Sequence, residues 1–74
     1  MNTPKARKYF TLAVREDGRW GPDFGDYDVM VVRQELMNRR DSGTKGKDLF
    51  IVSTGETQAE IDVAIAKLNA RHQG

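Results

Sequence analysis

Residues 9–20 read YFTLAVREDGRW, and this stretch decides the fold. Phe10, Leu12 and Val14 alternate with smaller or polar residues. A period of two is typical of a β-strand with one buried face. Asp17-Gly18, directly after the strand, is the dipeptide of a tight hairpin turn. We therefore expect a strand over 9–15 that turns back into a second strand over 19–24.

The second strand contains Pro22, which has no backbone N–H to donate to a neighbouring strand. We therefore place it at an edge of the sheet. A helix is expected next, with Asp26 or Asp28 as its N-cap. Its expected apolar stripe consists of Val29, Val32 and Leu36, widened by Met30 and Met37.

The polar segment 41–47 reads as a loop, and the run 49–52 (LFIV) that follows is apolar without alternation. Such a run suits a strand that is covered on both faces or nearly so. Thr57 and Glu60 have the spacing of a helix-capping box. The helix after them carries an amphipathic stripe made of Ile61, Ala64, Ile65 and Leu68.

The expected fold class is α+β, with the order β-β-α-β-α. A hairpin followed by a right-handed helical crossover gives a three-stranded antiparallel sheet of order 2-1-3. We expect both helices to pack on one face of this sheet, so that the other face stays open. Residues 9–74 then form one small domain, preceded by a disordered basic arm over 1–8.

Composition narrows the classes of function. The 74 residues carry 12 Lys and Arg against 11 Asp and Glu, a net charge of +1, which argues against a protein devoted to non-specific phosphate binding. With no cysteine and one histidine, the chain has neither a disulfide framework nor the usual ligands of zinc. No segment reads as a secretion signal or a membrane span, so we expect a cytoplasmic protein with no membrane association.

Candidate catalytic residues all have simpler explanations. The acidic groups around the first helix, at positions 23, 26, 28 and 35, suit capping and solvation better than paired acid–base catalysis. The loop 43–47 (GTKGK) lacks the spacing of a phosphate-binding loop and precedes a strand instead of a helix. His72 has no nucleophile or second base placed to partner it. We expect no catalytic residues, no metal site and no cofactor, and hence no enzyme.

The segment 20–28 (WGPDFGDYD) is the main candidate for a partner-binding site. Aromatic side chains ringed by acids resemble the anchors that dominate protein interfaces. The alternative is that Trp20, Phe24 and Tyr27 fold inward over one end of a thin core. The candidate partner-binding residues are Trp20, Asp23, Phe24, Asp26, Tyr27 and, on the expected open sheet face, Tyr9.

A second apolar stripe lies on the back of the last helix. It consists of Val63, Ala66 and Ala70, at positions where an isolated helix faces solvent. The expected open sheet face would also expose apolar area, and a contiguous apolar patch is suited to a partner or to a homodimer.

The run from Trp20 to Asp28 with the helix after it, and the closing helix from Gln58 to Asn69, resemble small accessory proteins encoded by phages and prophages. The resemblance implies a compact protein that acts on a host or phage component by binding it, in some cases to inhibit it, as anti-defence proteins do. It carries over no catalytic residues.

Two alternatives stay open. The first is a nucleic-acid-binding accessory protein that uses two clusters of cations, namely Lys5, Arg7 and Lys8 in the arm and Arg39, Arg40, Lys45 and Lys47 around the loop 39–47. The second is a minor structural protein of a phage particle.

Overall fold

The hairpin forms as the sequence predicts. The computed structural model describes residues 8–71, and in it β1 (Tyr9–Glu16) pairs antiparallel with β2 (Arg19–Asp26). Asp17 and Gly18 join them with positive φ angles of 53° and 78°. Two successive positive φ values define the type I′ turn, whose twist matches that of the flanking strands.

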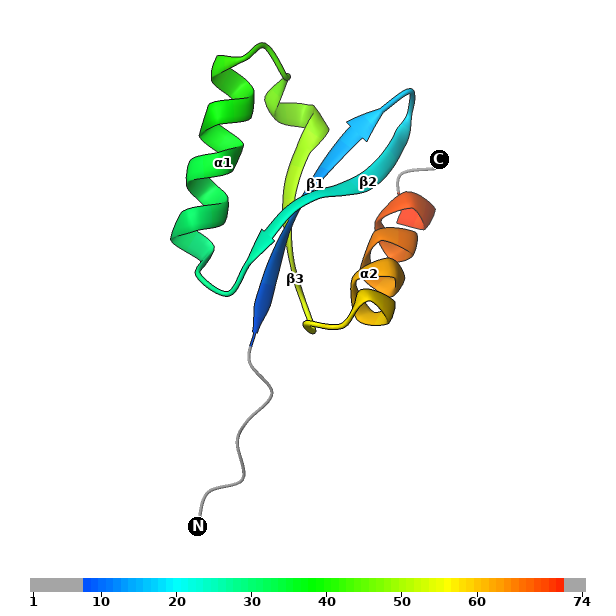
Figure 1. Cartoon of the computed structure of the whole chain (residues 1–74). Coiled ribbons are helices and arrows are strands. Elements are labelled where there is room, and N and C mark those ends of the chain that lie inside the picture. Colours follow the sequence, from blue (N-terminus) through cyan, green and yellow to red (C-terminus); the bar gives the residue numbers. More distant parts are fainter. Residues whose placement is uncertain (1–7, 72–74) are drawn as a thin grey trace.

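The third strand, β3 (Leu49–Thr54), pairs antiparallel with the other edge of β1. The register runs from Tyr9 opposite Thr54 to Val14 opposite Leu49. The sheet order is therefore β2-β1-β3, which confirms the predicted order and α+β class. Both β2 and β3 are edge strands (Figure 1).

Strand β2 contains a bulge at Asp23. Leu12 lies opposite Phe24, but the next residue of β1, Ala13, lies opposite Pro22, so Asp23 is the extra residue. Side chains two and four apart on a regular strand share a face. The bulge breaks this rule, since Trp20 packs on one side of the sheet and Phe24 on the other.

The first helix, α1 (Val29–Asp41), begins at Asp28, whose side chain accepts a hydrogen bond from the backbone N–H of Met30 at 2.9 Å. Of the two predicted caps, Asp28 is therefore the one used. Val32 is fully buried and Leu36 packs beside it, as predicted. The prediction that Met30 and Met37 widen this stripe is wrong, because they lie on the outer side of the helix and are 63% and 47% exposed.

A short 3₁₀ turn, η1 (Gly46–Asp48), leads into β3, and the second helix, α2 (Gln58–Arg71), follows it. The predicted capping box is present. The backbone N–H of Glu60 donates to Thr57 Oγ1 at 3.2 Å, and the Thr57 hydroxyl donates to the Glu60 carboxylate at 2.8 Å. Ile65 and Leu68 are buried against the sheet, with Ile61 beside them.

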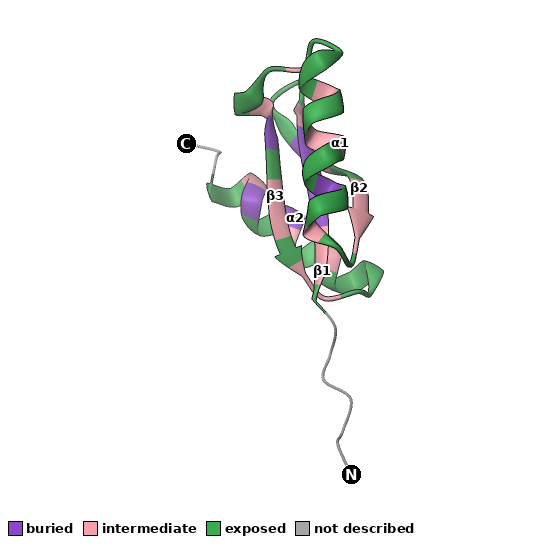
Figure 2. Cartoon of the chain, turned by 90° about the vertical axis from the view of Figure 1, so that its left-hand side faces the viewer, coloured by how far each residue is buried: buried purple, intermediate pink, exposed green. Residues whose placement is uncertain are grey.

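The two helices lie on opposite faces of the sheet, so the prediction that both share one face is wrong (Figure 1). One core lies under α1 and consists of Leu12, Val14, Val32 and Leu49. The other lies under α2 and consists of Ala13, Trp20, Ile65 and Leu68. In Figure 2, accordingly, α1 lies in front of the sheet and α2 behind it.

The width of the sheet explains this arrangement. Two strand spacings cover about 10 Å, which is roughly the diameter of one helix. A helix that lies over the middle of such a sheet covers most of one face, so α2 buries more of its apolar stripe on the other. There it covers Thr11 and Ala13, which are 2% and 0% exposed, so the predicted open face does not exist. The apolar run of β3 indicated covering on both faces, and this is what its two sides show, Ile51 packing towards α1 and Val52 towards α2.

Candidate functional site

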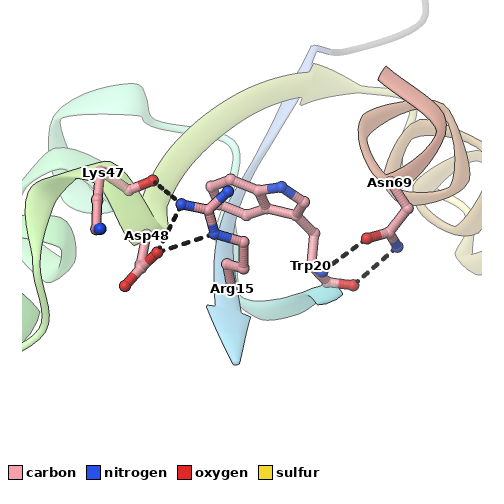
Figure 3. Close-up of polar contacts among 5 residues, drawn as sticks. All are labelled: Arg15, Trp20, Lys47, Asp48 and Asn69. Carbon is pink, nitrogen blue, oxygen red and sulfur yellow. Dashed lines mark hydrogen bonds and ion pairs between the residues drawn. The ribbon is translucent and has the colours of Figure 1, made fainter. Parts of the chain in front are cut away.

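Two aromatic side chains of the predicted site, Trp20 and Phe24, pack in the hydrophobic cores. Trp20 is 6% exposed and belongs to the core under α2. The side chain of Asn69 holds its backbone in two hydrogen bonds, and the Arg15 guanidinium lies 5.2 Å from the centre of its ring (Figure 3). Phe24 is half-buried against the core under α1. For Trp20 and Phe24 the structure thus selects the inward-packing alternative.

Arg15 also fixes the turn before β3. Its side chain donates to the Asp48 carboxylate at 2.9 Å and to the Lys47 carbonyl at 3.3 Å (Figure 3). The guanidinium therefore lies between η1 and the indole of Trp20, and its charge is compensated within the fold.

Tyr9 and Tyr27 form a small cluster at the opposite end of the sheet. Their rings meet edge to face, with centres 5.0 Å apart, and the Tyr27 hydroxyl donates to the Glu56 carboxylate at 2.6 Å. The Tyr9 phenol lies so close over Gly25 that a Cβ there would come within 3.0 Å of it. These contacts join β1, the end of β2 and the link before α2, and leave a hollow of about 190 Å³ beside Tyr9.

The predicted acidic residues serve structural contacts. The Asp23 carboxylate, on the bulge, pairs with Arg39 at 2.5 Å, and Glu35 pairs with the same guanidinium at 3.6 Å. The Asp26 side chain accepts a hydrogen bond from the backbone N–H of Asp28 at 2.8 Å. The carboxylates of Asp23, in the middle of β2, and of Asp26, at its end, thus serve contacts within the fold.

The predicted cationic clusters do not form one surface. Lys5 and Arg7 lie outside the described residues, as does His72. Lys8 precedes β1 at the end of the sheet where Tyr9 meets Thr54, whereas Lys45 and Lys47 lie beyond the other end of β3. Arg39 is engaged with two carboxylates, which leaves Arg40, Lys45 and Lys47 as the exposed cations of this loop.

The outer edge of β3 is unshielded in the described part of the chain. Edge strands present unpaired backbone N–H and C=O groups, which natural proteins shield with proline, charge or bulges. Strand β2 has such shields, namely Pro22, the bulge at Asp23 and the ion pair to Arg39. Strand β3 (LFIVST) has neither a proline, nor a charge, nor a bulge, and no other strand within residues 8–71 pairs with its outer side.

Exposed apolar side chains flank this edge. Phe50 on β3 is 45% exposed and Val63 on α2 is 53% exposed. Two adjoining hollows of about 440 and 340 Å³ run between β3 and α2 and share Ser53, Ala64 and Lys67 as lining residues. We call this surface, made of β3 and the flank of α2 with Glu60, Val63, Ala64 and Lys67, the β3 groove.

The exposed methionines of α1 lie towards the same edge. Glu35 and Arg39 mark the side of α1 that faces β2, because Arg39 pairs with Asp23 there. At about 100° per residue, Met30 and Met37 fall on the opposite side of the helix, towards β3. Apolar exposure is therefore concentrated beside β3 on both faces of the sheet.

The sequence located part of this surface. It identified Val63 on an outward stripe and predicted the strand order that makes β3 an edge. It did not identify the β3 edge itself, although the absence of proline and charge from residues 49–54 was a visible signal.

Two kinds of site are not found in the described part of the chain. Residues 8–71 contain no group of three His, Cys, Asp or Glu side chains placed to hold a metal ion. Neither of the two helices in this range has the length and apolar character needed to cross a membrane.

Comparisons with known proteins add no functional assignment, since the chain matches no family model, no curated protein and no solved structure.

Proposed function

We propose that this chain is a non-enzymatic accessory protein of phage type that works by stoichiometric protein–protein binding, and that the β3 groove is its contact surface. The observation that carries the proposal is the contrast between its two sheet edges. One is shielded by Pro22 and the Asp23 bulge, whereas the other is unshielded and flanked by the exposed Phe50 and Val63.

The chemistry of an open edge favours a protein as the ligand. A strand added to a sheet edge gains main-chain hydrogen bonds along its length, and side-chain pockets beside the edge supply specificity. The hollows between β3 and α2 lie where alternate side chains of an added strand would point. Phe50 and Val63 provide apolar area that such a strand would remove from water.

The use of the carboxylates supports a non-catalytic role. Asp23 and Glu35 pair with Arg39, Asp28 caps α1 and Asp26 holds the chain before it. Acid–base catalysis needs carboxyl groups that lie in a cleft and whose environments separate their pKa values. The four carboxylates here form ion pairs and capping hydrogen bonds within the fold instead. Inhibition of a host component, in the manner of an anti-defence protein, is the role that the resemblance to phage accessory proteins adds to the proposal.

Site-specific photo-cross-linking in the host cell tests the proposal. Phe50 is replaced by p-benzoylphenylalanine, and Val31 is replaced in the same way as a matched control, because it is 42% exposed on the outer side of α1. We expect a cross-linked protein adduct of defined mass from position 50 and none of comparable yield from position 31. Equal adduct patterns from both positions, or no protein adduct at position 50, would contradict the proposal.

A further inference from the structure

We infer that the occupant of the β3 groove is a second copy of this chain, joined by antiparallel pairing of the two β3 strands into one continuous six-stranded sheet. This inference rests on the proposed function, because it names the protein bound at the same surface. The chain then acts as a homodimer, and inhibition of a host component uses a surface other than the β3 groove.

The unequal edges of the sheet restrict how copies associate. Head-to-tail pairing of β2 with β3 would generate a ring or an open filament, but Pro22 and the Asp23 bulge block the β2 edge. The one combination of unshielded edges is β3 with β3. Such a contact uses the same surface on both copies, so it closes after two subunits.

The symmetry of that contact brings the second helices together. Two antiparallel neighbours in a sheet are related by a two-fold axis perpendicular to it, which keeps each face on its own side. Both copies of α2 then lie on the same face and run antiparallel across the junction. Phe50 and Val63 line that junction from each subunit and become covered.

Charge in the β3 groove is self-complementary about this axis. Glu60 and Lys67 lie on either side of Val63 and Ala64 along the flank of α2. Antiparallel helices therefore bring Glu60 towards Lys67 of the partner subunit, and the axis repeats this pair. Within residues 8–71 Lys67 makes no hydrogen bond or ion pair, so its ammonium group has no competing intramolecular contact. Complementary charges of this kind fix register and suppress wrong partners.

The oligomeric state of the full chain tests the inference directly. Sedimentation equilibrium from micromolar to millimolar concentration should show a reversible shift from 8.4 kDa to twice that mass. Val63→Lys should weaken the dimer by about tenfold or more, whereas Val31→Lys, on the outer side of α1, should leave it unchanged.

A charge-reversal pair tests the two-fold arrangement. Lys67→Glu and Glu60→Lys each place like charges across both symmetric contacts, so each variant alone should dimerise about tenfold more weakly. An equimolar mixture restores both opposite-charge contacts in the heterodimer and should regain the wild-type dissociation constant. A mixture that associates no better than either variant alone overturns the inferred arrangement.

Two further measurements keep the result decisive. Glu60 belongs to the cap with Thr57, so circular dichroism and thermal melting are compared for every variant, and Val63→Lys tests the same surface without touching the cap. A chain that remains monomeric at millimolar concentration overturns the inference. If position 50 then cross-links to a different protein, the proposed function survives with another occupant, and if it cross-links to none, both fail.

Discussion

The side chain of Asn69 on α2 forms hydrogen bonds with both the backbone N–H and the backbone carbonyl of Trp20 on β2. Its side-chain oxygen accepts from the Trp20 N–H at 2.7 Å, and its side-chain nitrogen donates to the Trp20 carbonyl at 3.1 Å (Figure 3). A carboxamide carries both an acceptor and donors, so it pairs with a peptide unit as a neighbouring strand does. This contact fastens α2 to the outer side of β2, on the face opposite α1.

Replacement of Asn69 should therefore destabilise the whole domain. Asn69→Ala removes two partly buried hydrogen bonds, each worth about 1 kcal/mol, so we expect a loss of about 2 kcal/mol in the free energy of unfolding. Urea denaturation followed by tryptophan fluorescence measures it. Asn38→Ala is the control, because Asn38 makes its side-chain contact on the exposed surface of α1 and should change stability by less than about 0.5 kcal/mol. Equal losses in the two variants would show that the hydrogen bonds to Trp20 stabilise the fold no more than an exposed side-chain contact does.

The contact between Tyr9 and Gly25 leads to a second prediction. Gly25→Ala places a methyl group where the Tyr9 phenol lies, so the ring must move away from Tyr27. We expect a cost of about 1–2 kcal/mol from overpacking and from the lost aromatic contact, with a changed near-ultraviolet circular dichroism signal. Gly21→Ala on the same strand meets no atom within 4 Å and serves as the control. A near-ultraviolet spectrum unchanged by Gly25→Ala would mean that the Tyr9 ring is not held over this glycine.

The elements follow from local sequence, whereas their placement does not. The alternation around Leu12 and the Asp17-Gly18 turn predict the hairpin, and Thr57 with Glu60 predicts the start of α2, because these signals act over a few residues. The face chosen by α2 depends on the width of the sheet, which no local pattern encodes. The two methionines were misplaced because helical spacing alone does not say how wide the buried stripe is.

The candidate site was predictable only in part for the same reason. Trp20 and Phe24 read as one aromatic patch because they lie close together in the segment 20–28. On a regular strand, residues four apart would also face the same way. The bulge at Asp23 places them on opposite faces of the sheet, and no residue type in the sequence indicates a bulge there. The β3 groove emerges only when the strand order, the shields of β2 and the exposed side chains are considered together.

The charge distribution predicts weak binding to nucleic acid. Of the cations around the loop, Arg40, Lys45 and Lys47 are exposed without a carboxylate partner among residues 8–71, whereas Arg39 is paired with Asp23. Three phosphate contacts give a slope of about −2.7 in a plot of log affinity against log salt, so we expect no shift of duplex DNA at physiological salt. Electrophoretic mobility measured at several salt concentrations checks this.

The triple variant Arg40→Ala, Lys45→Ala, Lys47→Ala separates the two functions. It should weaken any DNA shift seen at low salt and lower its salt slope by up to about 2.7, since only the arm cations Lys5, Arg7 and Lys8 remain of the two clusters. It should leave the cross-link from position 50 intact, because the loop is not part of the β3 groove. A steeper salt slope in the wild type, together with a cross-link lost in the triple variant, would favour the nucleic-acid alternative.

The bulge itself gives the sharpest prediction about the fold. Deleting Asp23 restores a regular strand in which Trp20 and Phe24 stand three positions apart, so they still point to opposite faces. Both aromatic side chains then keep their cores, and the deletion loses the exposed ion pair to Arg39, which is worth less than about 1 kcal/mol. The deletion should therefore stay folded at 25 °C, with only a small change in the free energy of unfolding.

Asp23→Ser is the matched control for this deletion. It keeps the extra residue and removes only the exposed ion pair to Arg39, so it should cost less than about 1 kcal/mol. Far-ultraviolet circular dichroism and urea denaturation compare the two proteins. A deletion that unfolds while the substitution stays folded would contradict this, because the regular strand already sends Trp20 and Phe24 to opposite faces. The expected outcome, a small loss for both variants, would show that the pairing positions of Trp20 and Phe24 opposite Arg15 and Leu12, and not the extra residue or its charge, keep the two side chains in separate cores.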